Sequence, residues 1–232
     1  MANGASSFHL WWQLPAGAPL TEVAVTLTVL RPPSVTALYF WALQVGFADR
    51  GRRLGAAHTG LQWHPGAPGG AVNWGGYHPD GGELAGTDSA LPTVDSINTR
   101  SWPWEPGVPY RFRVWSPEPG RWRASVTDDA AGRTAVIRDL MVGATELVEP
   151  VVWAEVFAAC TDPPTEVRWS ALSAVDSSGR ARHPVTAAVT YQSRANGGCP
   201  NTGAWADGAA LHQATGLPRR RPPRRPETLK LQ

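Results

Sequence analysis

Alternating apolar and polar residues predict the first strand of this chain. Residues 21–29 read T-E-V-A-V-T-L-T-V. The alternation places Val23, Val25, Leu27 and Val29 on one face, with mostly polar side chains on the other. We expect a strand with one buried face.

A second run, residues 38–47, alternates in the same way but is largely apolar at both sets of positions. Tyr39 and Trp41 belong to one face, and Leu38 and Phe40 to the other. A strand that is apolar on both faces has both faces covered. We therefore expect this strand to lie in the centre of a sheet.

The clearest hairpin joins residues 110–115 to residues 121–127 through a five-residue loop at 116–120 that contains two prolines and a glycine. The alternation puts apolar side chains on one of its faces and four arginines and a tryptophan on the other. The register expected for a five-residue loop pairs Trp115 with Arg121 and Arg113 with Arg123. The basic face consists of Arg111, Arg113, Trp115, Arg121 and Arg123.

Further strands are expected at residues 134–140, 151–159, 167–174 and 184–192, whereas residues 49–105 look rich in loops. Only short strands, around 60–63 and 72–74, fit between the Gly and Pro clusters of that middle section. Gly (24) and Pro (22) are abundant and charged residues make up only 17% of the 232 residues, so long amphipathic helices find no place. Nine or ten strands without helices predict an all-β, antiparallel sandwich or jelly roll.

The C-terminal end has a different composition. Residues 217–232 hold six Lys or Arg against one acid, although the whole chain carries a formal charge of only +2. Repeated Pro and Arg cannot bury apolar surface. We therefore expect one β-sandwich domain over residues 1–213 and a disordered basic tail over 214–232. The tail is either simply solvated or makes weak contact with nucleic acid or an anionic surface, and the body shows no signature of specific nucleic-acid binding.

Location is not settled by the sequence. No run approaches the roughly 20 apolar residues that span a bilayer, and the first ten residues lack the basic and apolar regions of a signal peptide. Cys160 and Cys199 are the two cysteines. Either they are free, or they form a disulfide, which would indicate an oxidising compartment.

Several aromatic and turn motifs lie between residues 36 and 175. They are residues 39–47 (Y-F-W-A-L-Q-V-G-F), 59–62 (T-G-L-Q), Trp74, 104–112 (W-E-P-G-V-P-Y-R-F), 122–128 (W-R-A-S-V-T-D), Trp153, Glu155 and Cys160. These motifs resemble an uncharacterised bacterial family, domain of unknown function 3472. The resemblance implies a secreted, concanavalin-like sandwich with glycan-related work and no known reaction. Relatives commonly carry an Asp where this chain has Gly75, so any role of that carboxylate is in doubt here.

Twelve tryptophans are several times the usual share, and some fall in Gly- and Pro-rich segments where sandwich proteins place binding residues. Indoles stack on the C–H faces of sugars, so the leading hypothesis is a lectin-like stacking platform with Gln62 and Glu105 orienting the glycan. The alternative is that these aromatics pin loops to the body. The platform residues are Trp63, Trp74, Tyr77, Trp102 and Trp104.

An enzyme is the second hypothesis, acting on a glycan or on an apolar biosynthetic intermediate as a hydrolase, lyase or cyclase. Glu155 interrupts an apolar strand, so it either pairs with an arginine or titrates with a raised pKa as a general acid or base. Arg113, Arg111 or Arg123 would stabilise charge. The arginines of the basic face need a negatively charged partner. That partner is either an acidic ligand or one of the carboxylates Glu155, Asp128 and Glu118.

Metal and cofactor signals are weak. The six histidines show no ligand spacing, and we expect no cofactor. A calcium site from the loop acids Asp80, Glu83, Asp88 and Asp95 is the alternative to their capping turns. A third hypothesis makes the protein an interaction module whose basic tail recruits a partner. The sequence leaves the oligomeric state open.

Overall fold

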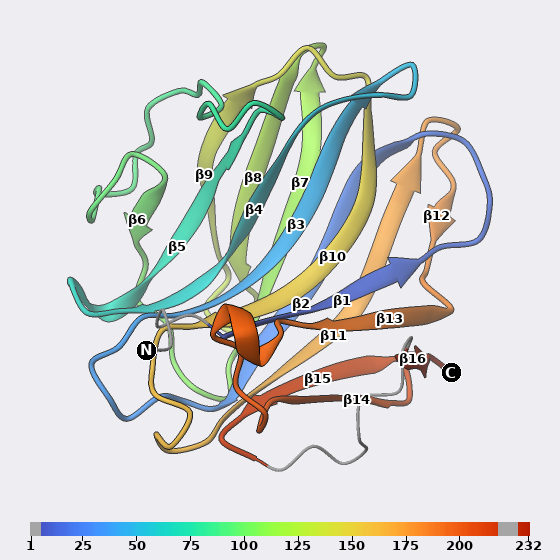
Figure 1. Cartoon of the computed structure of the whole chain (residues 1–232). Helices are drawn as coiled ribbons and strands as arrows, with labels where there is room; N and C mark the ends of the chain where they lie inside the picture. The colour runs from blue at the N-terminus through green and yellow to red at the C-terminus, as the bar shows by residue number, and fades with distance from the viewer. Residues whose placement is uncertain (1–5, 218–226) are drawn as a thin grey trace.

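The computed structural model describes residues 6–217 and 227–232, which fold into two packed antiparallel layers (Figure 1). Among these residues there are sixteen strands and no α-helix, only a single 3₁₀ turn at Arg194–Asn196. The all-β sandwich predicted from alternation is confirmed. No helix in the described part of the chain is long and apolar enough to cross a membrane.

One layer, which we call the β3 sheet, places strands from both ends of the chain around β3 and β10. Its strands run antiparallel throughout. In spatial order they are β16 (Glu227–Lys230), β13 (Thr186–Tyr191), β1 (Ser6–Gln13), β10 (Glu146–Val156), β3 (Tyr39–Asp49), β4 (Arg52–His64), β5 (Ala67–Tyr77) and β6 (Thr99–Ser101).

The second layer, the β2 sheet, lies behind the first in Figure 1 and holds the predicted hairpin. The layers join where β10 pairs with β2 at Leu147 and Leu20. In spatial order the β2 sheet contains β14 (Gly203–Asp207), β15 (Ala210–Thr215), β11 (Thr165–Asp176), β2 (Leu20–Arg31), β7 (Pro109–Glu118), β8 (Arg121–Asp128) and β9 (Arg133–Met141), with β12 (Ala181–Arg182) on β11.

The core lies between the layers and is built by alternation. Trp41 and Leu43 of β3 point inward, as do Phe112 and Val114 of β7, and all four side chains are buried. Burying such a side chain stabilises the fold by about 1.5–3 kcal/mol. The faces predicted for residues 21–29, 38–47 and the hairpin are the ones that pack here.

The prediction of a loop-rich middle section is confirmed for residues 78–98, which contain only isolated bridges and turns, but it is wrong for residues 52–77, because β4 and β5 are long strands of 13 and 11 residues. Their glycines indicated turns in the sequence but serve as strand residues at close contacts. A Cβ on Gly60 would lie 1.8 Å from the carbonyl oxygen of Trp41, and one on Gly76 would lie 2.0 Å from that of Ala56. Strands β1, β14 and β15 were also missed.

The C-terminal boundary needs correction too. Strand β15 continues to Thr215, and β16 pairs with β13, with Thr186 opposite Lys230. Residues 227–230 are therefore part of the sandwich rather than of a disordered tail. The Pro- and Arg-rich segment 218–226 lies outside the described residues.

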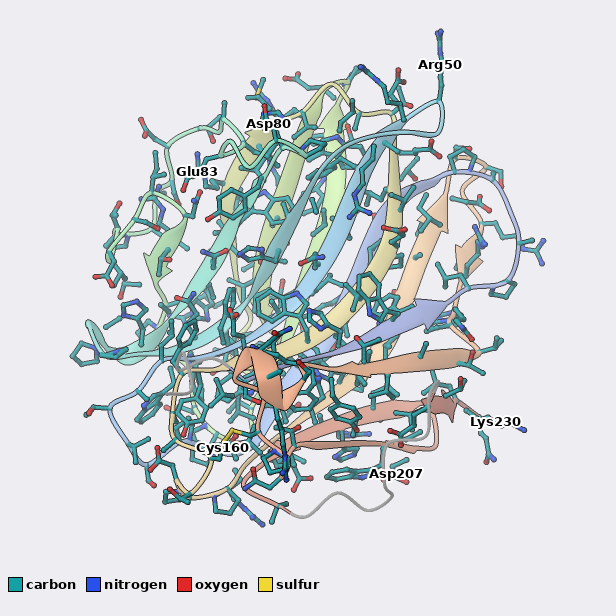
Figure 2. The ribbon with its side chains drawn as sticks, in the orientation of Figure 1. Arg50, Asp80, Glu83, Cys160, Asp207 and Lys230 are labelled. Carbon is teal, nitrogen blue, oxygen red and sulfur yellow. A yellow bond between two sulfur atoms is a disulfide. The ribbon has the colours of Figure 1, made fainter. Side chains whose placement is uncertain are left out.

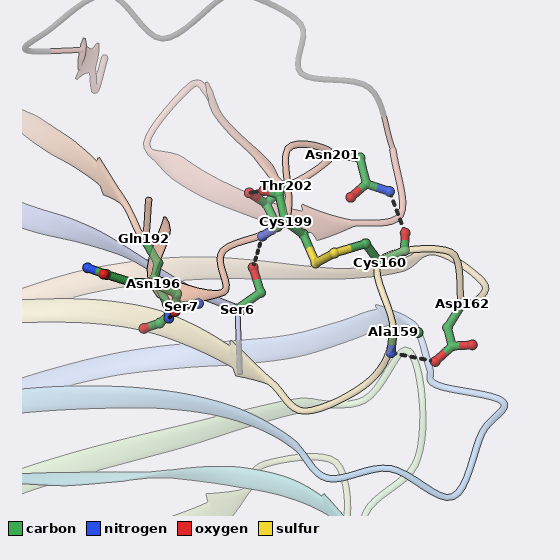
Figure 3. The surroundings of a disulfide bond; sticks show 10 residues. All are labelled: Ser6, Ser7, Ala159, Cys160, Asp162, Gln192, Asn196, Cys199, Asn201 and Thr202. Atoms are coloured by element: carbon green, nitrogen blue, oxygen red, sulfur yellow. Dashed lines mark hydrogen bonds between the residues drawn. A yellow bond between two sulfur atoms is a disulfide. The ribbon is translucent and has the colours of Figure 1, made fainter. Parts of the chain in front are cut away.

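Cys160 and Cys199 form a disulfide, with their Cα atoms 5.5 Å apart (Figure 3). The bond ties the segment that follows β10 to the segment that precedes β14. The backbone N–H of Cys199 also donates a hydrogen bond to Ser6 Oγ at 3.0 Å (Figure 3). The bridged alternative is the correct one.

Candidate active site on the outer face of the β3 sheet

The outer face of the β3 sheet has an apolar centre. Phe40 of β3, His58 of β4 and Trp153 of β10 form an aromatic cluster, with ring centroids 5.0 to 5.5 Å apart. Between them lie Ala42 and Gly60, which are paired in register and leave room for the rings. The second apolar face expected for residues 38–47 is therefore this outer surface.

Strand β1 extends the cluster on one side. The ring of His9 lies 6.2 Å from that of Trp153 and 5.8 Å from that of Trp11. The indole N–H of Trp153 donates a hydrogen bond to Gln44 Oε1 at 3.2 Å. The donors of the Gln44 carboxamide consequently remain available on this face.

Glu155 lies at one border of the aromatic cluster. Its neighbours in register are Ser7 on β1 and Phe40 on β3, and it takes part in no ion pair among the described residues. Burial without a cation raises the pKa of this carboxyl above its ordinary value. Of the two sequence hypotheses, pairing with an arginine is wrong and the raised pKa is correct.

Gln62 of β4 borders Phe40 on the opposite side from Glu155. Its Oε1 atom is buried and accepts no hydrogen bond in the described part of the protein. Strands lie about 4.8 Å apart, so the backbones of Glu155 and Gln62 are about 10 Å apart across β3. A carboxyl and a carboxamide thus flank one ring.

The two histidines of this face are held neutral by their surroundings. Burial lowers the pKa of His58 to about 4 and also lowers the pKa of His9. Both imidazoles are uncharged near neutral pH, because the protonated form would have to lose hydration among aromatic rings.

The predicted stacking platform does not form, because its indoles are used by the core. Trp74, Trp102 and Trp104 are 0, 2 and 6% exposed. Trp74 Nε1 donates to the carbonyl oxygen of Trp122, and Trp104 Nε1 donates to that of Gln62. Pinning of a loop is the correct reading for Trp102 and Trp104, which follow β6, whereas Trp74 is a core residue within strand β5.

The other residues predicted to bind a glycan do not form one site. Trp63 is partly buried and donates through Nε1 to the carbonyl oxygen of Val35, and Tyr77 is half exposed at the end of β5. Glu105 has an exposed side chain, and its backbone N–H donates to Tyr110 Oη at 2.9 Å.

The basic face exists, but its register and its partners differ from the expectation. A bulge between Trp115 and Glu118 shifts the pairing, so Trp115 faces Arg123 and Arg113 faces Ser125. The register that paired Arg113 with Arg123 is wrong, and the like-charge contact it implied is avoided. The guanidinium of Arg113 instead lies 4.3 Å from the centre of the Trp115 ring.

Protein carboxylates neutralise most of this face. Arg113 pairs with Glu22 at 2.6 Å, and Arg123 forms two hydrogen bonds to Asp139 at 2.7 and 2.9 Å. Of the anions expected, Glu118 does contact the face, through Arg121 at 3.0 Å, whereas Glu155 and Asp128 do not.

The basic face and Glu155 belong to opposite surfaces of the sandwich. Arg111, Arg113 and Arg123 point away from the core on the β2 sheet, and Glu155 points away from it on the β3 sheet. A catalytic site that combines Glu155 with Arg113 is therefore wrong, because the whole core separates them.

Loop acids make turn contacts instead of a cation site. Asp80 and Glu83 lie on the loop after β5 (Figure 2), and Asp80 Oδ1 accepts the backbone N–H of Gly82 at 3.0 Å. Asp95 pairs with His64 at 3.0 Å. Within residues 6–217 and 227–232 no group of three or more His, Cys, Asp or Glu is placed to hold a metal ion.

Comparison with known proteins rests on the fold alone. No model of a known protein family matches the chain, and no curated protein sequence matches it either. The resemblance to domain of unknown function 3472 stays a prediction.

Solved structures of similar fold include peptidases. One is a structure of SCP-B, a member of the eqolisin family of peptidases, in a complex with the tripeptide Ala-Ile-His. Another is scytalido-glutamic peptidase with a peptide-based transition-state analogue. Each is 12% identical, aligns over 90% of this chain and 97% of its own, and has a TM-score of 0.52. At this identity the likeness establishes a shared jelly-roll architecture.

Proposed function

We propose that the protein is a hydrolase that cleaves peptide bonds on the outer face of the β3 sheet, with Glu155 as its general acid and base. The observation that carries the proposal is a carboxyl with a raised pKa and no cationic partner among the described residues, set beside an aromatic cluster. A raised pKa makes a carboxyl a better proton acceptor than an ordinary Glu side chain, which suits acid–base catalysis.

In the proposed reaction the ionised carboxylate of Glu155 takes a proton from a water molecule, whose oxygen attacks the peptide carbonyl carbon. The electron pair of the C=O bond moves onto its oxygen, and the amide donors of Gln62 stabilise that oxyanion. The protonated carboxyl then gives its proton to the leaving nitrogen as the C–N bond breaks. Glu155 ends ionised, and the water has been divided between the two products.

The choice of a peptide over a glycan has two supports. Glycosidases use two carboxyls about 5–10 Å apart, whereas the residue that borders Phe40 on the side opposite Glu155 is Gln62, a carboxamide. The structures of similar fold are those of peptidases with a tripeptide or a peptide-based analogue. The lectin-like reading loses three of its five aromatic residues to the core.

The test is a peptide-library digest followed by mass spectrometry across pH 3–7, with Glu155→Gln compared with the parent. Removing the acid–base group should lower kcat/KM by at least about 100-fold. Glu105→Gln is the matched control, because that side chain is exposed and lies outside the strands β1, β10, β3 and β4 that carry the face, and it should cleave like the parent. Cleavage that survives in Glu155→Gln would overturn the assignment.

A further inference from the structure

A cavity of about 230 Å³ opens at the far end of the same face. Gln44 and His58 form its inner wall, Ala56 lies on its floor, and Tyr77 stands at its rim. Gln44 lies four residues beyond Phe40, the neighbour of Glu155, so the cavity is about 13 Å along the strands from Glu155.

An ion pair lies beside this cavity. Arg53 of β4, which lines the cavity, binds Glu149 of β10 across the intervening strand β3. A Cβ on Gly46 of β3 would lie 3.5 Å from Arg53 Nη2 and 2.8 Å from Val148 Cγ2. The guanidinium therefore lies over the glycine.

The inner wall offers hydrogen bonds without net charge. Gln44 Oε1 already accepts from Trp153, which leaves the amide N–H groups of Gln44 as donors. His58 has no hydrogen bond among the described residues and, as a neutral imidazole, carries one donor and one acceptor nitrogen. Arg53 also lines the cavity, and its positive charge is neutralised by Glu149. A charged ligand group would therefore lose hydration without gaining a counter-ion.

The size and the walls of the cavity point to one aromatic ring with a hydroxyl. A volume of about 230 Å³ has room for a single six-membered ring and its substituent. The rings of His58 and Tyr77 provide aromatic surfaces for it. A hydroxyl both donates and accepts, and so matches Gln44 and His58 together.

We propose that this cavity binds a tyrosine side chain of the substrate, about four residues from the bond that is cleaved. The proposal rests on the peptidase function proposed above and names a substrate preference for it. An extended peptide advances about 3.3 Å per residue, so four residues cover the distance from Glu155 to the cavity.

Direct binding tests the cavity without any need for catalysis. Calorimetric titration with N-acetyl-tyrosinamide and N-acetyl-phenylalaninamide should give about five- to tenfold tighter binding of the tyrosine compound, the share of one hydroxyl hydrogen bond. Ala56→Leu fills the floor and should abolish binding of both, whereas Ala56→Ser, the small control, should retain it. If Ala56→Leu does not fold, Tyr77→Ala at the half-exposed rim should weaken binding at least threefold.

Equal affinity for the two compounds, or binding unaffected by both Ala56→Leu and Tyr77→Ala, would overturn the proposal. So would binding of a methyl glycoside here in place of the tyrosine compound. The two proposals fail separately. If the protein binds the tyrosine compound but cleaves no peptide, the cavity assignment stands and the hydrolase proposal fails. If cleavage depends on Glu155 but shows no preference for tyrosine, the hydrolase proposal stands and the cavity assignment fails.

Discussion

Burial beside the aromatic cluster shifts the pKa values of individual side chains on the outer face of the β3 sheet. The same desolvation that raises the pKa of Glu155 lowers that of His58. For Glu155 the sequence indicates two alternatives, an ion pair with an arginine or a raised pKa, because a carboxylate interrupts an apolar strand. It gave no signal for His58, since the rings that surround it come from β3 and β10.

The His58 imidazole predicts a pH dependence of stability. Its folded pKa of about 4 lies below the ordinary histidine value of 6.5, so the unfolded chain binds more protons between these values. The contribution of neutral His58 to the free energy of unfolding is therefore fully present above pH 6.5. It decreases as the pH falls toward 4, by about 2–3 kcal/mol at most. Urea unfolding at pH 4.5 and 7 should show a smaller difference for His58→Gln than for the parent. An equal difference would contradict the account.

Whole strands were predictable where the alternation is regular and not where glycine interrupts it. The residue patterns predict β2, β3, β7 and β8, but they predict β4 and β5 too short. In a sequence glycine indicates a turn, whereas in these two strands it permits a neighbouring backbone to approach. Sequence alone does not distinguish these two uses, since the partner strand is not known in advance.

A glycine substitution tests this interpretation of β4. Gly60→Ala places a Cβ 1.8 Å from the Trp41 carbonyl oxygen, so the strands must separate, and unfolding should become easier by at least about 3 kcal/mol. Gly143→Ala is the matched control, because no atom lies within 4 Å of its added Cβ, and it should change stability by less than about 1 kcal/mol. Similar costs in urea denaturation would refute the close-contact explanation.

At the scale of the whole molecule, topology decides which residues meet. The candidate site combines β1, β10, β3 and β4, segments that are far apart in sequence. Topology also separates Glu155 from Arg113, two residues that composition and face patterns had placed in one site. Neither result follows from local patterns, because strand order across two layers is a global property of the fold.

The disulfide also acts at this scale. It links Cys160 to a residue 39 positions further on, and a loop of that size should stabilise the fold by about 3–4 kcal/mol. Cys160→Ser with Cys199→Ser should lower the urea midpoint accordingly, and a reducing agent should lower the midpoint of the parent to the same value. A parent that is unaffected by reduction would contradict the role of the bridge.

The pH–rate profile of peptide cleavage is the most direct test of the central claim. Peptides found in the library digest would be assayed for kcat/KM from pH 3 to 8 with the parent and Glu155→Gln. The account predicts a limb in the parent with an apparent pKa above that of an ordinary Glu, and a loss of at least about 100-fold together with that limb in the variant. A variant that retains both the rate and the limb would show that Glu155 is not the acid–base group.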